Sequence, residues 1–456
     1  MSLHQKVANR ILFPLDCVRN GSLDIIRYMR EFERSQFLPR QQLEELSFSR
    51  LQTVLKYAYA NVAFYRNAFD ARGLKPSHVQ TMSDLKAFPI LEKEHIQNHI
   101  DELVSREFAK SELLLDRTGG STGAPIEYYY SKQRYHSRKA ATWRHNGFVD
   151  WRIGDKAAVL WGASRDLPEP KLKQKLRNLI LDRTLFFNTA GFQPQAIVQF
   201  NDQLKKFRPK VVLAYANSLA LFAKYLQAER IQPYSPKAII TSAETLTPEN
   251  RRLIEATFGA PVFNRYGSRE FSVIASECPK RDGLHVMSEG LFVEIMKDGR
   301  HVEKGETGEL IITDLLNFAM PLIRYRIGDA ASWASGDCSC GRGLPRLSGI
   351  AGRTTDFLVG ADGRLCSGAV LTVAMVAQRP SLGQVQLEQN ERGRIICRIA
   401  PKSGVKMFPE DRQFLIDQVR QYLGDGTAIE FDIVSRIEHE TSGKYRFSKS
   451  TVKDLF

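Results

Sequence analysis

The chain has 456 residues, of which 43% are hydrophobic and 25% are charged, a composition that excludes an intrinsically disordered protein. This length exceeds what one hydrophobic core usually organises, so we expect one large domain and a smaller one. The formal net charge of +14 favours an anionic partner, such as a nucleic acid, an anionic membrane face or a polyanionic small molecule, although a solvated basic surface explains it equally well.

The distribution of charged and apolar residues narrows these classes. The Lys and Arg residues are scattered without a run of five or more, which argues against a nucleic-acid partner because such proteins carry a basic patch or stripe. Residues 1–30 lack the continuous apolar core of a signal peptide, and the apolar window 211–222 is too short to span a bilayer. Six cysteines in so long a chain suit a reducing compartment. We therefore expect a cytoplasmic protein without a transmembrane segment.

Residues 1 to about 110 are predicted to be mainly helical. Apolar residues in the segment 43–62 recur mostly three or four positions apart, which is typical of one buried face of a helix. We find no candidate chemistry before residue 110. The stripe consists of Leu43, Leu46, Leu51, Val54, Leu55, Ala58 and Val62.

The stretch Thr118–Pro125 is the first candidate for chemistry. Its glycines allow positive φ and close approach of backbone N–H groups to an anion, and its hydroxyl side chains add donors. It follows the apolar run 113–115 and precedes the strand-like segment 126–130, so it is expected to be a turn between two extended segments. It is either a cradle for phosphate groups or an ordinary hairpin turn. The candidate nucleotide-binding residues are Thr118, Gly119, Gly120, Ser121, Thr122 and Gly123.

Strand and helix patterns alternate from about residue 131 to residue 265. A helix is expected from Ser131, a plausible N-cap, to about Gly147, which suits the C-terminal stop. A second helix is expected with Ser218 as its cap, and a third opens with Thr247-Pro248 and closes before Gly259. This alternation favours a parallel sheet with right-handed crossovers and ligands at the strand C-terminal ends. The predicted strands are 157–161, 211–215, 237–241 and 261–265.

The pattern changes after residue 284. Short strands and turns over 284–334 predict an antiparallel sheet. A boundary near residues 352–356 precedes a small α+β domain. Its predicted elements are helix 368–378, strands 383–390 and 394–400, helix 409–423, strand 427–434 and a polar tail. The predicted fold class is therefore α/β, with parallel and antiparallel sheets in a large domain and a small C-terminal α+β domain.

Several separate motifs follow the glycine-rich loop in a fixed order. Together with residues 118–125, this order resembles the adenylate-forming superfamily of acyl- and aryl-coenzyme A ligases, in particular its phenylacetate-coenzyme A ligase-like branch. That branch includes relatives associated with capsular polysaccharide pathways. The resemblance covers about 110–450. The motifs are Ser242-Ala243-Glu244, Tyr266-Gly267-Ser268-Arg269-Glu270, Tyr325-Arg326-Ile327-Gly328-Asp329, Gly352-Arg353-Thr354-Thr355-Asp356 and Thr441-Ser442-Gly443-Lys444.

The resemblance implies a nucleotide site made from these motifs. The family places adenine beside the segment that matches Ser242-Ala243-Glu244, and the Tyr that matches Tyr266 stacks on the adenine ring. The Asp that matches Asp329 accepts both ribose hydroxyls, and Arg353 is expected near the ribose. The implied nucleotide-binding residues outside the loop are Ser242, Ala243, Glu244, Tyr266, Gly267, Ser268, Asp329 and Arg353.

The same resemblance implies catalytic residues and a domain arrangement. Glu270 matches the Glu that helps to hold Mg²⁺, and Lys444 matches the catalytic lysine. The family pattern implies an N-terminal adenylation domain over 1–352 and a small mobile C-terminal domain over 353–456, with the hinge at Asp356. A lysine on a mobile domain could enter for adenylation and leave for thiol transfer.

The expected chemistry suits these residue types. Attack of a carboxylate on the α-phosphorus of ATP adds negative charge to an anionic centre, so the site needs Mg²⁺, backbone donors and a cation. Taken singly, Glu270 could be a surface ion-pair partner, Asp329 a turn cap and Lys444 a solvated lysine.

Two positions depart from the pattern of the resembling family. Ile126 stands where many members carry a lysine, and Arg269 stands where a hydroxyl residue is usual.

A second constellation combines Cys278-x6-His285 with Cys338-x-Cys340-Gly341. Thiolates and imidazole suit tetrahedral Zn²⁺, and the Cys-x-Cys-Gly turn can present two sulfurs together. The alternative is free cysteines with a packed histidine. The remaining cysteines are interpreted as buried small hydrophobic residues. They are Cys17, Cys366 and Cys397.

The resemblance implies an AMP-forming carboxylate–coenzyme A ligase that uses ATP, Mg²⁺ and coenzyme A, with an aryl or arylacetic acid as substrate. Tyr135, Trp143 and Tyr215 could line the acid pocket or belong to the core. One alternative transfers the acyl group to a carrier-protein thiol or to a sugar in polysaccharide assembly. Another is a non-catalytic nucleotide-binding protein. The prediction is compatible with a homodimer.

Overall fold

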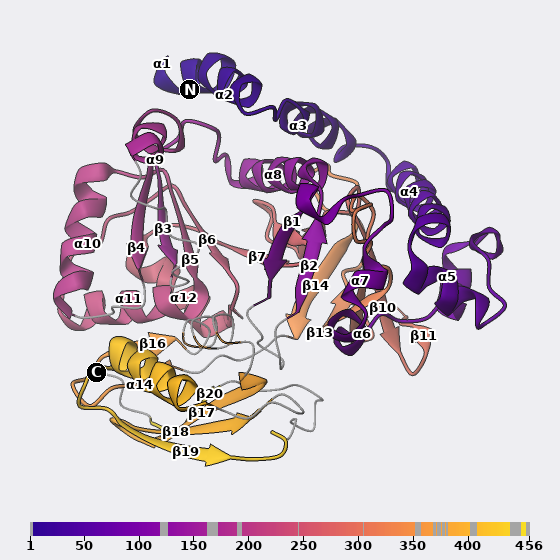
Figure 1. Ribbon diagram of the computed structural model, residues 1–456. Helices are drawn as coiled ribbons and strands as arrows, with labels where there is room; N and C mark the ends of the chain where they lie inside the picture. The colour runs from indigo at the N-terminus through magenta and orange to yellow at the C-terminus, as the bar shows by residue number, and fades with distance from the viewer. Residues whose placement is uncertain are drawn as a thin grey trace. The chain divides into compact units, whose positions relative to one another are not determined.

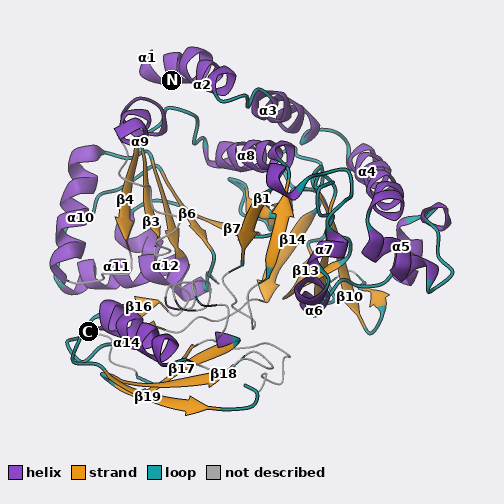
Figure 2. Ribbon diagram, viewed as in Figure 1, coloured by secondary structure: helices purple, strands orange, loops and turns teal. Residues whose placement is uncertain are grey.

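The computed structural model consists of two compact units (Figures 1 and 2). The first comprises Met1–Arg117, Ile126–Ile153 and Phe263–Gly352, and the second comprises Thr118–Pro125, Gly154–Val262 and Arg353–Phe456. The predicted domain boundary at residue 352 remains a prediction. The structure describes residues 3–118, 126–161, 172–188, 194–244, 246–303, 305–351, 357–367, 371, 375, 379, 382–401, 408–437 and 448–452.

The N-terminal part of the first unit is helical, as predicted. In the longest helix, α4, the predicted apolar stripe is buried except for Leu46, which is half-exposed. Within the described part of the chain, no helix has both the length and the apolar character needed to cross a bilayer. The helices up to the glycine-rich loop are α1 (Leu3–Val7), α2 (Phe13–Arg19), α3 (Asp24–Ser35), α4 (Arg40–Asn61), α5 (Ala63–Asp70), α6 (Lys93–Asn98) and α7 (Ile100–Leu103).

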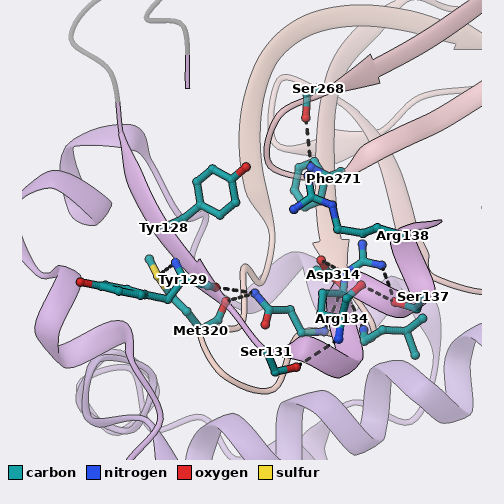
Figure 3. Close-up of polar contacts among 12 residues, drawn as sticks. Tyr128, Tyr129, Ser131, Arg134, Ser137, Arg138, Ser268, Phe271, Asp314 and Met320 are labelled. Atoms are coloured by element: carbon teal, nitrogen blue, oxygen red, sulfur yellow. Dashed lines mark hydrogen bonds and ion pairs between the residues drawn. The ribbon is translucent and has the colours of Figure 1, made fainter. Parts of the chain in front are cut away.

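Helix α8 (Lys132–Asn146) follows the loop and begins as predicted. The Ser131 hydroxyl accepts a hydrogen bond from the Arg134 N–H at 3.1 Å, which satisfies one of the orphan donors of the first turn (Figure 3). The predicted C-terminal stop is confirmed, since α8 ends at Asn146 and Gly147 is its C-cap. Gly147 keeps a right-handed helical conformation and starts a 3₁₀ turn, and the chain reverses at Asp150, where φ is +57°.

The first unit contains a mostly buried antiparallel sheet. Eight of its strands are hydrogen-bonded in the order β11-β10-β12-β13-β14-β9-β8-β7, and each neighbouring pair is antiparallel. The antiparallel pattern predicted for 284–334 is thus confirmed. The strands are β7 (Val262–Ser268), β8 (Ser272–Glu277), β9 (Leu284–Val286), β10 (Leu291–Lys297), β11 (Arg300–His301), β12 (Gly308–Asp314), β13 (Tyr325–Trp333) and β14 (Arg346–Ala351).

A buried ion pair joins α8 to the turn before β10. Arg144 Nη1 lies 3.1 Å from Glu289 Oε1, and neither side chain has exposed surface. The Ser35 hydroxyl of α3 donates to the same Glu289 oxygen at 2.7 Å. The pair therefore links three segments that are distant in sequence.

We expect Arg144→Met to lower the free energy of unfolding by about 3–5 kcal/mol, because Glu289 would stay buried without its cation. Urea unfolding followed by tryptophan fluorescence measures this change. The matched control is Arg40→Met, which removes an exposed partner of Glu44 and should cost about 0–1 kcal/mol. Equal, small effects of the two substitutions would contradict the prediction.

The second unit begins with a parallel sheet, as predicted. Its strands β3 (Ala157–Trp161), β4 (Thr184–Asn188), β5 (Val211–Tyr215) and β6 (Ala238–Ser242) lie in the order β6-β5-β3-β4, and the three neighbouring pairs are parallel. Strand β4 was not predicted, and neither were two of the helices. The helices are α9 (Leu172–Arg177), α10 (Pro194–Phe207), α11 (Ala216–Ala228) and α12 (Pro248–Phe258).

The start of α11 corrects one prediction. Ser218 is not its cap, because the helix begins at Ala216 directly after β5, and Ser218 lies fully buried in the first turn. Helix α12, in contrast, has the predicted ends. Thr247 accepts a hydrogen bond from the Asn250 N–H at 3.2 Å, and Gly259 closes the helix with φ of +60°. A Cβ atom is disfavoured at such a φ, so glycine suits this stop.

The C-terminal segment of the second unit is a small α+β arrangement, as predicted. Its four-stranded sheet has the order β19-β18-β17-β20, and β20 pairs in parallel with β17. Strand β20 was not predicted, because it lies in the polar tail. Most of the predicted helix 368–378 lies outside the described residues. The elements are β15 (Phe357–Val359), β16 (Leu365–Ser367), β17 (Gln384–Glu391), β18 (Arg394–Ala400), α14 (Pro409–Leu423), β19 (Ala428–Ile433) and β20 (Ser448–Ser450).

Candidate functional site

The motif Tyr266–Glu270 forms the end of β7 and the turn into β8. The strand register shifts between Tyr266 and Gly267, and a Cβ atom on Gly267 would lie 2.5 Å from the Ser272 carbonyl oxygen. Only glycine fits this close approach. The Phe271 N–H donates to the Ser268 hydroxyl at 3.3 Å across the turn (Figure 3). The glycine of the motif is therefore required by the shape of the turn.

Two hydrogen bonds join this turn to the motif at the start of β13. The Tyr266 hydroxyl donates to Asp329 Oδ2 at 2.7 Å, and the Tyr325 hydroxyl donates to Glu270 Oε1 at 3.2 Å. Each motif thus supplies one tyrosine and one carboxylate. Glu270 and Asp329 are both 8% exposed, and a buried carboxylate requires such donors. Each of the two predicted acidic residues is therefore held by a tyrosine of the other motif.

The outer side of the turn is held by the elements that follow the glycine-rich loop. The Tyr128 hydroxyl lies 3.0 Å from Asp116 Oδ2 and 2.5 Å from the Arg269 carbonyl oxygen. Arg138 of α8 also donates to the Arg269 carbonyl, and its guanidinium lies 4.8 Å from the centre of the Tyr130 ring. Burial raises the pKa of Tyr128, so its phenol stays neutral. Figure 3 labels Tyr128, which comes from β2, and Arg138, which comes from α8.

The structure shows the surroundings of Ile126 and Arg269, the two positions that depart from the pattern of the resembling family. Ile126 is fully buried, so its side chain belongs to the core and offers no polar contact. Arg269 is half-exposed, and its carbonyl is the acceptor for Tyr128 and Arg138. The turn therefore carries an arginine of its own and is contacted by a second one from α8.

Strands β1 (Leu114–Arg117) and β2 (Glu127–Tyr130) flank the glycine-rich loop. They pair antiparallel, with Arg117 opposite Glu127, which confirms the predicted extended segments on both sides of the loop. Thr118 is buried. The other predicted loop residues lie outside the described residues, as do three further candidates. These are Gly119, Gly120, Ser121, Thr122, Gly123, Arg353, Asp356 and Lys444.

The motif Ser242-Ala243-Glu244 lies in the second unit, at the carboxyl end of β6, as predicted. Ala243 has φ of +68°, so the chain turns sharply there. Glu244 is buried, and its Oε2 accepts a hydrogen bond from the Asn217 N–H in the first turn of α11 at 2.7 Å. A carboxylate is stabilised at a helix N-terminus. The motif is therefore fixed at the sheet edge where ligands of parallel sheets bind.

The predicted Cys/His constellation is brought together in the first unit. Cys278 follows β8, His285 lies in β9, and Cys338 and Cys340 lie between β13 and β14. Their candidate ligand atoms all lie within 4.8 Å of one another. Burial raises the pKa of Cys278 to about 12 and lowers the pKa of His285 to about 4. The two halves of the motif therefore meet, as the sequence predicted.

The other cysteines and Tyr215, one of the three aromatic residues proposed for the acid pocket, have packing roles. Cys17, Cys366 and Cys397 are buried, as predicted. Tyr215 is also buried, and its ring centre lies 4.2 Å from that of Trp161, so it belongs to a core cluster. Sequence reasoning missed the hydroxyl partners of the acidic residues. No local pattern marked the partners Tyr266 and Tyr325, because each contact joins two motifs that are distant in sequence.

Comparison with protein families gives one match, to the C-terminal part. Residues 358–451 match the model of the CapK C-terminal domain. Over 429 residues the chain is 24% identical to Protein CapK of Staphylococcus aureus, which covers 90% of each chain. It is 25% identical over 431 residues to the phenylacetate-coenzyme A ligase of Aromatoleum evansii, covering 88% of this chain and 93% of that one.

Further relatives include the phenylacetate-coenzyme A ligase of Thermus thermophilus, which is 26% identical over 337 residues, 71% of this chain and 73% of that one. Among solved structures, a 2-hydroxyisobutyryl-CoA ligase in complex with 2-HIB-AMP and CoA matches with a TM-score of 0.63 and 20% identity over 91% of both chains. This likeness confirms the predicted fold, a mixed α/β architecture of the adenylate-forming coenzyme A ligases.

Proposed function

We propose that this chain, which is related to phenylacetate-coenzyme A ligases and to CapK over most of its length, is an AMP-forming carboxylate–coenzyme A ligase. The observation that carries the proposal is the cluster in which Tyr266 contacts Asp329 and Tyr325 contacts Glu270. Two motifs about 60 residues apart in sequence meet there with the residue types that the nucleotide and metal require.

The reaction has two steps. A carboxylate oxygen of the acid attacks the α-phosphorus of ATP, forming an acyl-adenylate and releasing pyrophosphate. The thiol of coenzyme A then attacks the acyl carbon, forming the thioester and releasing AMP. We propose an aryl or arylacetic acid as substrate, in keeping with the phenylacetate-specific names of several relatives.

The chain's residues would position ATP for the first step. Tyr266 would stack on adenine beside Ser242–Glu244, while Asp329 would accept the ribose hydroxyls, with Arg353 close by. The glycine-rich loop would direct its N–H groups to the phosphates. The hydrogen bond from Tyr266 to Asp329 orients the carboxylate, so the adenine and ribose contacts would be set together.

Glu270 fits a magnesium ligand. Its carboxylate is buried and oriented by Tyr325, and Mg²⁺ is usually held by one or two carboxylates together with substrate phosphates. When bound, Mg²⁺ neutralises charge that develops on the phosphate oxygens. Lys444 would place its ammonium group at the same phosphate during adenylation, and Asp356 would act as the hinge that brings it there.

The test is acid-dependent exchange of radiolabelled pyrophosphate into ATP across a panel of carboxylic acids. We expect at least one aryl or arylacetic acid to support exchange, and the same acid to yield a thioester and AMP when coenzyme A is added. Absence of exchange with every acid would overturn the proposal. A protein that bound ATP but released no AMP with any acid and acceptor would instead be a non-catalytic nucleotide-binding protein.

A second candidate keeps the adenylation and changes the acceptor to a carrier-protein thiol or a sugar. It is favoured by the match of residues 358–451 to the CapK C-terminal domain, because in this superfamily pattern the second step depends on the C-terminal domain. AMP release and product formation without any need for coenzyme A would support this candidate over the first.

The contact between Tyr266 and Asp329 gives a testable prediction. We expect Asp329→Asn to raise KM for ATP about 10- to 100-fold, because a hydrogen bond to a charged group contributes about 1.5–3 kcal/mol. Tyr266→Phe, which keeps the ring, should raise it less. Exchange kinetics at varied ATP measure both. The control is Asp202→Asn on α10, whose side chain is 57% exposed, and an unchanged KM in Asp329→Asn would contradict the assigned role.

A further inference from the structure

We propose that the first unit contains a structural zinc site whose four ligands are Cys278, His285, Cys338 and Cys340. All four side chains come from the end of the antiparallel sheet: from the β8–β9 turn, from β9 itself and from the β13–β14 connection. The ligase chemistry uses none of them. The site therefore adds a metal centre that is independent of the proposed activity.

The distances match a tetrahedral site. The Cys278 and Cys338 sulfurs are 3.6 Å apart, and the Cys340 sulfur lies 3.3 Å from His285 Nε2. A Zn²⁺ ion bound at about 2.3 Å to sulfur and about 2.1 Å to nitrogen holds two sulfurs about 3.8 Å apart and a sulfur and a nitrogen about 3.6 Å apart. The side chains are thus already spaced around one central position.

Both cysteine-bearing segments form the same kind of turn. The Arg281 N–H donates to the Cys278 carbonyl at 2.9 Å, and the Gly341 N–H donates to the Cys338 carbonyl at 3.1 Å. Arg281 and Gly341 both have positive φ. In addition, the Lys280 N–H bonds to the Cys278 sulfur. The backbone of this turn therefore directs a donor at the sulfur that would bind the metal.

A disulfide does not explain the cluster. A disulfide requires an S–S distance of about 2.05 Å, whereas the Cys278 and Cys338 sulfurs are 3.6 Å apart and all six cysteines are free. Three sulfurs and one imidazole form a complete soft donor set for Zn²⁺. Because the protein fills all four positions, none is left for water or substrate, and the site is structural in type.

The surroundings balance the charge of such a site. Three thiolates and one Zn²⁺ carry one net negative charge, which is costly to bury without a counter-charge. The guanidinium groups of Arg342, Arg346 and Arg144 lie close enough to act electrostatically on His285. Arg342 is itself fixed, since its Nε donates to Gln36 Oε1 at 2.9 Å and its guanidinium lies 4.3 Å from the Phe148 ring centre.

The site would anchor the sheet to the helical lead-in. The Gly343 N–H donates to the Gln36 carbonyl at 3.0 Å, and a Cβ atom on Gly343 would lie 2.0 Å from the Leu38 carbonyl oxygen. Cys278 and Cys338 also pack with Leu43 of α4 in one buried cluster. Zinc would therefore hold together the β8–β9 turn, the β13–β14 connection and the α3–α4 junction.

The first test is the metal content of the full-length protein, purified without a histidine tag or chelator. We expect about one zinc per chain by inductively coupled plasma mass spectrometry. A mercurial that reacts with thiols should release this zinc to a chromogenic chelator. Reconstitution with Co²⁺ should give the visible absorption of a tetrahedral thiolate site. A protein with negligible zinc after growth in zinc-supplemented medium, and without that Co²⁺ spectrum, would overturn the proposal.

Substitutions localise the metal. Cys338→Ser and Cys340→Ser should lose most of the zinc and lower the thermal midpoint, whereas Cys17→Ser makes the same change at another buried cysteine of the first unit and should retain one zinc per chain. If both ligand variants kept full zinc, the assignment would be wrong. Metal content is measured without substrate, so it is separate from any failure of the proposed ligase activity.

Discussion

Glu270→Gln is expected to slow the adenylation half-reaction by about 10²–10³-fold, the typical cost of removing one charge-stabilising group from a transition state. Gln keeps the size of the side chain and an oxygen that can accept from the Tyr325 hydroxyl, which contacts Glu270 at 3.2 Å. It removes the negative charge that would bind Mg²⁺. Pyrophosphate exchange at saturating acid and ATP, measured over a range of Mg²⁺ concentrations, checks this expectation.

The Mg²⁺ series separates a metal role from a loss of folding. A metal ligand predicts that the variant needs more Mg²⁺ for half-maximal exchange and that its circular dichroism and thermal midpoint stay close to those of the parent. The matched control is Glu249→Gln on α12, whose side chain is 72% exposed. If Glu270→Gln exchanged pyrophosphate at the parent rate and with the parent Mg²⁺ dependence, Glu270 would not be a metal ligand.

Lys444→Ala is expected to slow adenylation by about 10²–10³-fold while leaving thiol transfer nearly unchanged. The ammonium group is proposed to offset charge on the reacting phosphate only in the first step, because the domain that carries it is proposed to move away before the second. Pyrophosphate exchange measures the first step. Single-turnover conversion of a synthetic arylacetyl-adenylate with coenzyme A measures the second.

The control for this difference between adenylation and thiol transfer is Lys449→Ala, which removes a lysine of β20 a few residues further along the chain. Both steps should proceed at the parent rate in that variant. An Lys444→Ala protein that lost the two steps equally would indicate a structural role or an error in the assignment. Normal exchange in Lys444→Ala would remove the lysine from the proposed mechanism altogether.

Local signals were sufficient for much of the fold. Helix α12 begins after a capping threonine and a proline and ends at Gly259, which has positive φ. All three signals lie within the segment itself. The buried stripe of α4 follows from its period in the same way. The spacing of strands, helices and turns also predicted which part of the chain forms parallel strands and which part forms antiparallel strands.

Signals that depend on distant partners were missed. Strand β20 has three residues in a polar tail, and it is a strand only because it pairs with β17, some 60 residues earlier. The proposed cap at Ser218 was wrong for a related reason. Strand β5 passes directly into α11, so no loop residue is available to cap the helix, and tertiary burial places the serine inside it.

In the candidate site, too, local motifs could be predicted from the sequence, whereas contacts between distant segments could not. The order of motifs predicted that the motifs of Glu270 and Asp329 belong to one site, which stays a prediction, and the structure joins these two motifs by one hydrogen bond at each carboxylate. Their tyrosine partners could not be predicted, because a hydroxyl contact depends on the register between the strands that carry the motifs. The four residues of the Cys/His cluster could be identified from the sequence, because their types and the Cys-x-Cys-Gly turn indicate metal ligands. That they come within 4.8 Å of one another depends on how the sheet folds.

The pairing of β20 with β17 acts as a tether for the tail lysine. Ser448 lies opposite Leu387 in this ladder, and Lys444 precedes Ser448 by only four residues. At about 3.5 Å per residue, the Cα atom of Lys444 stays within about 14 Å of that anchor. The position of the small sheet therefore limits where the ammonium group can act. The four-residue spacing between Lys444 and Ser448 sets that limit.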